Sequence, residues 1–249
     1  MNGFRKASVD EIEDGIEEIY DNGVALSNYF NADVDGFEYL KTEKSILLKK
    51  DEVGFSRVYF LTNDVGDLTS ELSRIETTTV INIPSKDGIA AFEPVLEKSG
   101  FKPYRVYEVY ENHEFRGNDV FRAEFASGKD LERVKFLLYD QLDTFADHLP
   151  SDETIAKFIA NNQVLVNYEN DEICGIFIFT VQGKKCYFNY WVDLGSNGLF
   201  LLLQMYDWLK EQNIAYSYLW VDTQNQKVKR IHTLLGSRPN GTKDYIYTK

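Results

Sequence analysis

The sequence predicts an α/β (α+β) protein whose two halves repeat one order of helices and strands. Strand-like apolar runs alternate with helix-like runs along the 249 residues, which is typical of a mixed fold. Residues 96–103 and 232–239 match, because Gly100 and Gly236 are each followed three residues later by a proline. The shift that takes Gly100 to Gly236 also takes a strand-like run at 79–83 to another strand-like run at 215–219. An internal repeat of this kind predicts two copies of one structural unit.

The two copies are expected to meet in a polar, non-periodic stretch at residues 112–119. Such a composition is typical of a short linker, so we expect one domain at residues 1–117 and a second at residues 118–249. The first domain lacks the long central hairpin of the second and reads as an abbreviated copy. In it we expect helices at 9–22, 36–40 and 67–76, and strands at 45–50, 57–62, 79–83 and 104–110.

The second half is interpreted from its periodicity and its turn residues. Ser151 can cap a helix that starts just after Pro150, and the two acids that follow favour the same start. Gly183 lies in a hairpin turn between two apolar strands. We expect helices at 130–140, 151–160, 199–212 and 226–235, and strands at 120–126, 163–168, 173–181, 186–193, 214–221 and 242–247.

Composition argues against several classes of function. Forty acidic and 27 basic residues give a net charge of −13, whereas nucleic acids and anionic membranes attract basic surfaces, so we expect neither partner. Cys174 and Cys186 lie in apolar runs and read as reduced, buried thiols. The three histidines are far apart and no zinc-ligand spacing is present, so we expect no metal site. The polar start and the short apolar runs predict a cytoplasmic protein.

Several stretches of the second half carry a recognisable order of elements. They are Trp191-Val192-Asp193, the loop from Gly195 to Gly198, the apolar helix that starts at Leu199, and the helix at 228–236 with Asn225 just ahead of it. With the two helices and the hairpin before them, they make the chain resemble the GNAT superfamily of N-acyltransferases. The resemblance implies two GNAT-like domains, each a mixed, mostly antiparallel sheet flanked by helices.

The resemblance also implies acetyl-CoA, or another acyl-CoA, as the cofactor. In the family the pantetheine arm lies along an exposed strand edge, and the next loop binds pyrophosphate at a helix N-terminus. The matching cofactor-binding residues are Trp191, Val192, Leu194, Gly195, Ser196, Asn197, Gly198, Leu199, Asn225 and Lys229. The alternatives are a plain turn for the loop, a helix cap for Asn225 and a solvated helix face for Lys229.

Two residues are candidates for catalysis. His232 takes the position at which the family often has a tyrosine that protonates the leaving thiolate, and imidazole can donate a proton near neutral pH. The alternative is an exposed or helix-packed histidine with no catalytic role. Asp193, at the strand end, could relay a proton from an amine or repel pyrophosphate. Leu96 takes the matching position in the first half, so the first domain is expected to be non-catalytic.

The leading hypothesis is a CoA-dependent N-acyltransferase that moves an acetyl (acyl) group to a primary amine. The acidic surface suits a cationic acceptor, such as a small amine or a lysine-containing peptide. The alternative is a catalytically inactive GNAT-like binding or regulatory protein. It is supported by Asp193 and Ser196, which replace the Arg or Gln and the first Gly of the family loop. An aminoacyl-tRNA-dependent transferase is a third reading, against which the net charge weighs.

Overall fold

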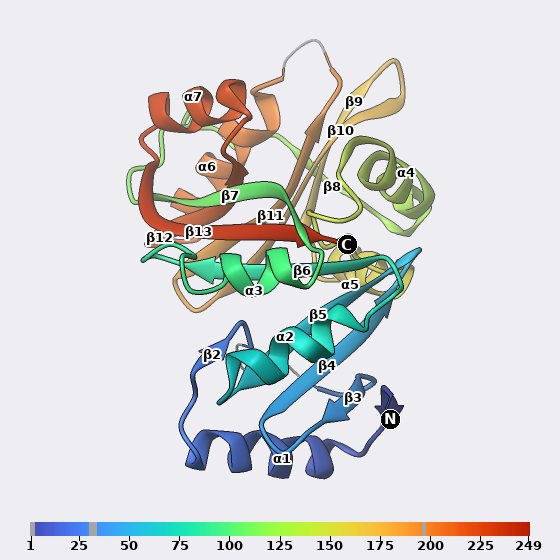
Figure 1. Ribbon diagram of the computed structural model, residues 1–249. Coiled ribbons are helices and arrows are strands. Elements are labelled where there is room, and N and C mark those ends of the chain that lie inside the picture. The colour runs from blue at the N-terminus through green and yellow to red at the C-terminus, as the bar shows by residue number, and fades with distance from the viewer. Residues whose placement is uncertain (1–2, 30–33, 196–197) are drawn as a thin grey trace. The chain divides into compact units, whose positions relative to one another are not determined.

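The computed structural model describes residues 3–29, 34–195 and 198–249 (Figure 1). The chain divides into two compact units. Unit 1 contains residues 1–107 and 242–249, and unit 2 contains residues 108–241. The chain passes from one unit to the other inside two long strands, β7 (Lys102–Asn112) and β13 (Arg238–Thr248). Among the described residues, no helix is long and apolar enough to cross a membrane.

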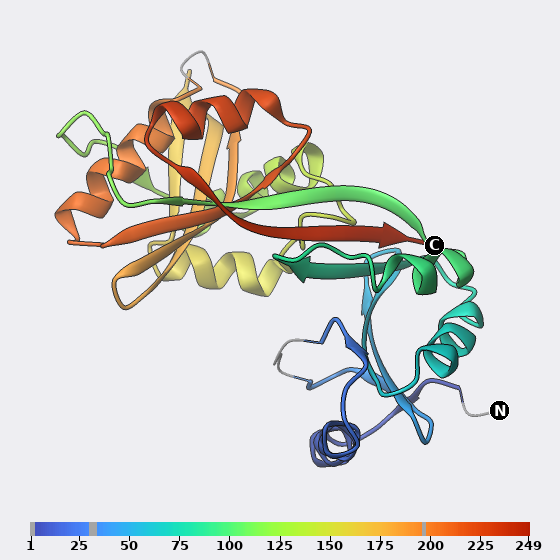
Figure 2. The same ribbon diagram turned by 60° about the vertical axis from the view of Figure 1, so that its left-hand side comes forward.

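Unit 1 is a sheet with helices on both faces (Figures 1 and 2). Its strand order is β1-β3-β4-β5-β6-β13, with β2 paired to β5. Helix α1 buries Ile12, Ile16 and Ile19 on one face, and α2 buries Leu68 and Leu72 on the other. The elements are β1 (Arg5–Lys6), α1 (Val9–Asp21), β2 (Leu26–Ser27), β3 (Glu38–Lys41), β4 (Ser45–Glu52), β5 (Phe55–Thr62), α2 (Val65–Ser73), β6 (Thr79–Ser85) and α3 (Glu93–Lys98).

Residues 36–40 do not form the expected helix. Gly36 has a φ of +77°, which fits a turn, and β3 then pairs antiparallel with β4 from Glu38↔Lys49 to Lys41↔Ile46. Tyr39 and Leu40 are both buried, at 2% and 7% exposed. This segment is a strand because it pairs with β4 and is buried on the sheet. Its secondary structure could not be predicted from five residues, because so short a run does not show whether its apolar residues repeat with a helical or a strand period.

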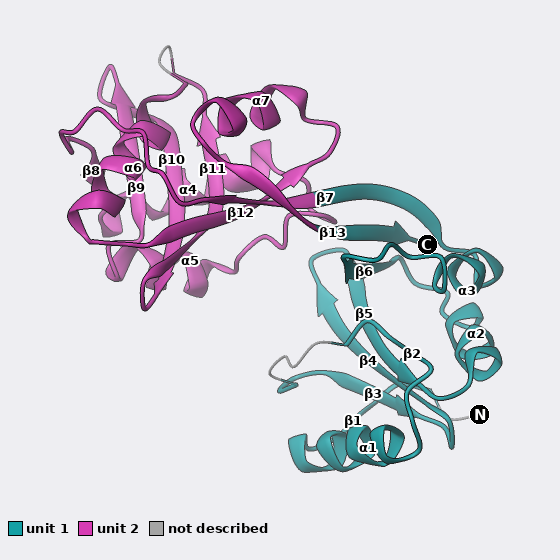
Figure 3. Ribbon diagram, turned by 90° about the vertical axis from the view of Figure 1, so that its left-hand side faces the viewer, with its two compact units in different colours: residues 1–107, 242–249 teal, residues 108–241 magenta. Residues whose placement is uncertain are grey.

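Unit 2 is also a sheet between helices (Figure 3, magenta). Its strands follow the order β12-β11-β10-β9-β8. Helices α4 and α5 pack Leu138 and Ile155 on one face, whereas α6 and α7 pack Met205, Leu209 and Ile231 on the other. The elements are β8 (Glu124–Phe125), α4 (Leu131–Gln141), α5 (Asp152–Ala160), β9 (Val164–Glu169), β10 (Glu172–Gln182), β11 (Lys185–Asp193), α6 (Phe200–Glu211), β12 (Tyr216–Asp222) and α7 (Gln226–Leu234).

The structure confirms the mixed α/β class and the repeated order of elements. Unit 1 runs β5, α2, β6, α3 and β7, and the later part of the chain runs β11, α6, β12, α7 and β13. Within the described pairings, β5–β6 and β11–β12 are parallel, whereas the other registered pairs are antiparallel. The predicted cap at Ser151 is present, since its hydroxyl accepts from the Thr154 N–H.

The polar stretch at residues 112–119, expected to be a linker, is held by unit 2. The carboxylate of Asp207, 2% exposed, accepts the backbone N–H groups of residues 118 and 119 at 3.0 and 2.7 Å. A Cβ on Gly117 would lie 1.9 Å from Asp207 Oδ1, so the close approach requires glycine. Gln204 Oε1 accepts the Ala123 N–H at 2.9 Å. Because helix side chains bind this backbone, the strand expected at 120–126 shrinks to β8.

The final strand contributes to unit 1. From Lys243 to Thr248, β13 pairs antiparallel with β6, and the backbones of Thr79 and Lys249 exchange hydrogen bonds at 3.0 and 2.9 Å. Residues 242–249 therefore pack with unit 1, although they follow the second copy of the repeat in the sequence. Strand pairing between distant segments sets this division, and local sequence carries no signal for it.

Candidate functional site

The candidate site lies where two neighbouring parallel strands of unit 2 separate. β11 and β12 pair over three residues only, from Lys185↔Tyr216 to Tyr187↔Tyr218. Beyond that point β11 keeps its pairing with β10 as far as Gly175↔Asp193, after a register shift between Ile178 and Phe179. The β12-facing backbone edge of residues 188–193 therefore has no β12 partner in the registered pairs.

Three side chains on this part of β11 hold buried polar atoms with no hydrogen-bond partner among the described residues. They are Asn189 Oδ1, Trp191 Nε1 and Asp193 Oδ2. Most buried polar groups in folded proteins are hydrogen-bonded, and an unpaired donor or acceptor costs about 1–3 kcal/mol. Three such atoms within five residues of one strand point to a place where a ligand completes the hydrogen bonding.

His232 faces this edge from helix α7. Its ring lies edge-on to the ring of Trp191, with centroids 5.8 Å apart and an interplanar angle of 86°. The side chain is fully buried, and neither ring nitrogen has a hydrogen-bond partner among the described residues. Burial lowers the pKa of His232 to about 4, so the imidazole is neutral at pH 7. Its role as proton donor stays a prediction.

Asp193 ends the strand and shapes the loop that follows. Its Oδ1 accepts the Gly195 N–H at 3.0 Å. Burial raises the pKa of this carboxyl above its usual range, and the nearby charge of Glu169 acts in the same direction. A Cβ on Gly195 would lie 2.9 Å from both Cys174 Sγ and Glu169 Oε1. The loop therefore passes closely over side chains from β9 and β10.

Helix α6 begins directly after this loop, and its N-terminus has no side-chain cap among the described residues. Its N-cap is Leu199, which has no polar side chain, and its first turn has no acidic residue. Helices α5 and α7, by contrast, are capped by Ser151 and Asn225. The free N–H groups at such a terminus favour anions. Leu194 and Leu199 are exposed, whereas Ser196 and Asn197 lie outside the described residues.

The remaining predicted residues sit on α7 or within the β11 sheet. Asn225 Oδ1 accepts the Val228 N–H at 3.1 Å, so Asn225 is the N-cap of α7. Lys229 lies one turn further along the helix, partly exposed. Val192 is 5% exposed and packs with the core on the α4 and α5 face. Trp191, Asp193 and His232 are thus the predicted residues for which the structure shows a common neighbourhood near the end of β11.

Three further residues of the site were not predicted from the sequence: Glu169, Cys174 and Asn189. The first two reach the loop through the pairing of β9, β10 and β11, so their place depends on strand register. Asn189 falls at the irregularity in β11, which breaks the two-residue alternation of a strand. No local pattern marks such a bulge. Among the described residues, no group of three or more His, Cys, Asp or Glu could hold a metal ion.

The sequence matches no protein-family model and no curated protein, but the structure is similar to solved structures over nearly its whole length. A GNAT-family acetyltransferase from Colwellia psychrerythraea aligns at 7% identity and a TM-score of 0.55, covering 99% of this chain and 98% of that one. A GCN5-related N-acetyltransferase from Sphaerobacter thermophilus aligns at 14% and 0.60, covering 98% and 86%. A tandem GNAT protein from the clavulanic acid biosynthesis pathway aligns at 11% and 0.52, covering 99% and 97%. The chain has the GNAT fold.

The first GNAT-like half contains the same strand separation, but its own chain fills the opening. β5 and β6 pair only at Ser56↔Thr79 and Arg57↔Val80. Strand β2 then adds to the free edge of β5. The side chain of Asn28, 4% exposed, accepts the Phe60 N–H at 2.6 Å and donates to the carbonyls of Val58 and Asn82 at 3.2 and 3.0 Å. Asn28 therefore bridges the two strands.

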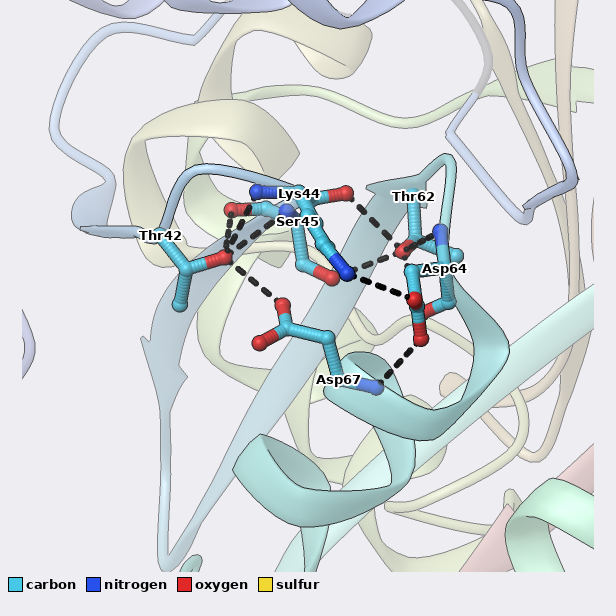
Figure 4. Close-up of polar contacts among 6 residues, drawn as sticks. All are labelled: Thr42, Lys44, Ser45, Thr62, Asp64 and Asp67. Carbon is cyan, nitrogen blue, oxygen red and sulfur yellow. Dashed lines mark hydrogen bonds and ion pairs between the residues drawn. The ribbon is translucent and has the colours of Figure 1, made fainter.

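The helix that follows this first opening is also closed by its own side chains (Figure 4). Asp64 Oδ1 accepts the Asp67 N–H at 2.9 Å, and Asp64 Oδ2 pairs with Lys44 Nζ at 2.9 Å. Thr42 Oγ1 donates to Asp67 Oδ2 at 2.7 Å. A carboxylate thus occupies the N-terminus of α2, whereas no described side chain caps α6 of the second half.

Proposed function

We propose that unit 2 is a CoA-dependent N-acyltransferase that moves an acetyl (acyl) group from acetyl-CoA to a primary amine. The observation that carries the proposal is the separation of β11 from β12 beyond Tyr187, which leaves a strand edge and several buried polar atoms without partners among the described residues. The GNAT fold of the chain supports it, because neighbours with this fold include proteins described as N-acetyltransferases. The filled opening in unit 1 favours unit 2 as the site.

The residues at the opening suit such a cofactor. The backbone edge at Trp191–Asp193 and the Trp191 indole N–H can bond the amide groups of a pantetheine arm. The start of α6, which no described side chain caps and which has Gly198 exposed just before it, suits the diphosphate. Lys229 on α7 supplies a cation to the same unit. Negative charge on Asp193 and Glu169 would repel an anion at the loop. The raised pKa of Asp193 reduces this repulsion, because a protonated carboxyl carries no charge.

The same residues can support transfer to an amine. When bound, acetyl-CoA supplies the acyl group and a thiolate leaving group. The backbone N–H groups of the β11 edge can stabilise the negative charge that develops on the carbonyl oxygen. Asp193, with its raised pKa, can accept a proton from an incoming ammonium group. The net charge of −13 favours a cationic acceptor, such as a small amine or a lysine-containing peptide.

Calorimetric titration with acetyl-CoA tests the proposal. Trp191→Phe keeps an aromatic ring but removes the unpaired indole N–H, and we expect about a tenfold loss of affinity from one hydrogen bond to the ligand. Trp208→Phe is the matched control, because Trp208 lies on α6 and packs against Phe179, with the two rings tilted by 54°. Absence of heat and of a thermal shift at millimolar acetyl-CoA would refute the proposal.

A catalytically inactive GNAT-like binding or regulatory protein is the second candidate. It is favoured by His232, which occupies the position assigned to the proton donor but is fully buried and neutral at pH 7. The two candidates differ in the release of free CoA thiol across a panel of amines. Binding of acetyl-CoA without release would favour the inactive protein. Release that is lost in His232→Ala, with acetyl-CoA affinity retained, would favour the enzyme.

A further inference from the structure

A second candidate site lies in unit 1, in a groove between helix α1 and strand β3. The groove has a volume of about 770 Å³. Five carboxylates line it against two basic side chains, Arg5 and Lys41. Both bases are already paired, Arg5 with Glu11 and Lys41 with Glu18. The carboxylates are those of Asp10, Glu11, Asp14, Glu18 and Glu43. Asp10, Asp14 and Glu43 make no ion pair with the described residues, so the groove retains negative charge.

The groove also contains the hydroxyl of a tyrosine. Tyr39 lines the groove from β3 and is only 2% exposed. Its hydroxyl makes no hydrogen bond with the described residues and is not one of the buried polar atoms that lack a partner, so the oxygen opens into the groove. The Arg5 guanidinium lies 5.5 Å from the centre of the Tyr39 ring. A hydroxyl that opens into a groove beside unpaired carboxylates can accept a hydrogen bond from a cationic ligand there.

Helix α1 makes room for this hydroxyl with a glycine. A Cβ on Gly15 would lie 2.4 Å from the Tyr39 hydroxyl oxygen. Glycine in the middle of a helix costs about 0.5–1 kcal/mol relative to alanine, so its presence here needs a compensating contact. Burial raises the pKa of Tyr39 to about 12, which keeps the hydroxyl protonated and able to accept a hydrogen bond from a cation.

The spacing of the acids suggests the shape of the ligand. Asp10, Asp14 and Glu18 follow one another at intervals of four residues on α1. Such residues share a helix face and lie about 6 Å apart along the axis. Nitrogens joined by three or four methylene groups have a similar separation. We propose that this groove binds an extended ligand with two or more alkylammonium groups, held by the α1 carboxylates and the Tyr39 hydroxyl.

Calorimetric titration of the full chain with spermine and with tetralysine tests the proposal and distinguishes a free polyamine from a peptide. We expect Asp10→Asn/Asp14→Asn to weaken binding by about tenfold or more, and Tyr39→Phe by about threefold to tenfold. Glu13→Gln/Glu17→Gln is the matched control, because these exposed acids lie on α1 outside the groove and their change removes the same charge. The control is expected to change affinity by less than about threefold, because salt screens surface charges that lie away from the ligand.

Each outcome has a defined meaning. Binding of one ligand or of both, with losses confined to the groove variants, supports the proposal and names the source of the ammonium groups. Equal losses in the groove and control variants would show attraction to the net charge alone and would overturn it. Absence of binding to either ligand at millimolar concentration would also overturn it. Circular dichroism of Tyr39→Phe checks that the fold is unchanged. The titration needs no acetyl-CoA, so its result is independent of the function proposed for unit 2.

Discussion

Replacing Asn28 with alanine is expected to destabilise unit 1 far more than replacing an exposed asparagine would. The side chain is 4% exposed and bridges β5 and β6, which do not pair with each other at this level. Alanine would leave the buried Phe60 N–H without its acceptor and would remove one donor each from the Val58 and Asn82 carbonyls. An unsatisfied buried donor costs about 1–3 kcal/mol and each further lost bond about 0.5–1 kcal/mol, so the expected loss is about 3 kcal/mol.

Urea denaturation followed by far-ultraviolet circular dichroism measures this loss, and hydrogen exchange of the Phe60 amide locates it. The tryptophans, Trp191, Trp208 and Trp220, all lie in unit 2, so their fluorescence reports on the other unit. In Asn28→Ala we expect the Phe60 amide to exchange much faster than in the wild type, because its acceptor has been removed.

Two further variants separate the hydrogen bonds from side-chain volume. Asn22→Ala removes an exposed side chain with one bond to the Glu18 carbonyl, at 2.8 Å, and is expected to cost about 0.5 kcal/mol or less. Asn28→Asp keeps the shape but turns the amide donor into an oxygen that faces two carbonyls. It should destabilise at least as much as Asn28→Ala at pH 7. A loss below about 1 kcal/mol in Asn28→Ala would refute the bridging role.

The other predictions concern unit 2. Gly117→Ala would place a Cβ 1.9 Å from Asp207 Oδ1 and break the bonds that hold the backbone of residues 118 and 119. We therefore expect the free energy of unfolding to fall by about 2–4 kcal/mol and the melting temperature to fall by about 4–16 °C, and an unchanged melting temperature would contradict the contact. His232 has a pKa of about 4 in the folded protein, below its usual 6.5, so the unfolded chain binds its proton first as pH falls. Its contribution is fully favourable above about pH 7 and declines by about 3 kcal/mol as pH falls toward 4. The wild type should therefore lose more stability over that range than His232→Gln, and an equal loss in the two proteins would contradict the burial of a neutral His232. Burial raises the pKa of the Cys186 thiol, so this thiol should resist a disulfide reagent until urea unfolds the chain; rapid reaction in the native protein would show that it is accessible.

Local sequence patterns predicted the long elements of this chain well. Periodic apolar residues and a serine cap placed α1, α5 and α6 within a few residues of their observed bounds. The turn at Gly183, with a φ of +61°, joins β10 and β11 as expected. Short segments failed, because residues 36–40 and 120–126 take their structure from the strands and side chains they meet. The predicted GNAT-like order of elements was confirmed, because it depends on the long helices and strands.

The candidate site, like the fold, could be predicted from the sequence only in part. From the sequence, Trp191, Asp193 and His232 could be assigned to one site only through the resemblance to GNAT enzymes. The structure adds the separation of β11 from β12 and the contact between the Trp191 and His232 rings. It also shows Asn225 as a helix cap, which was the alternative considered for that residue. Burial decides the charge of His232, and burial is a property of the packed unit that no neighbouring residue encodes.

The sequence by itself determined the mixed class, the duplication and the acidic surface, because periodicity, turn residues and composition are local or additive properties. Only the tertiary structure decided that the opening of the first half is filled by Asn28 and that of the second half leaves polar atoms unpaired. It also decided that residues 242–249 pack in unit 1. These features depend on hydrogen bonds between segments far apart in the chain, and such pairings are selected by the packing of the whole unit.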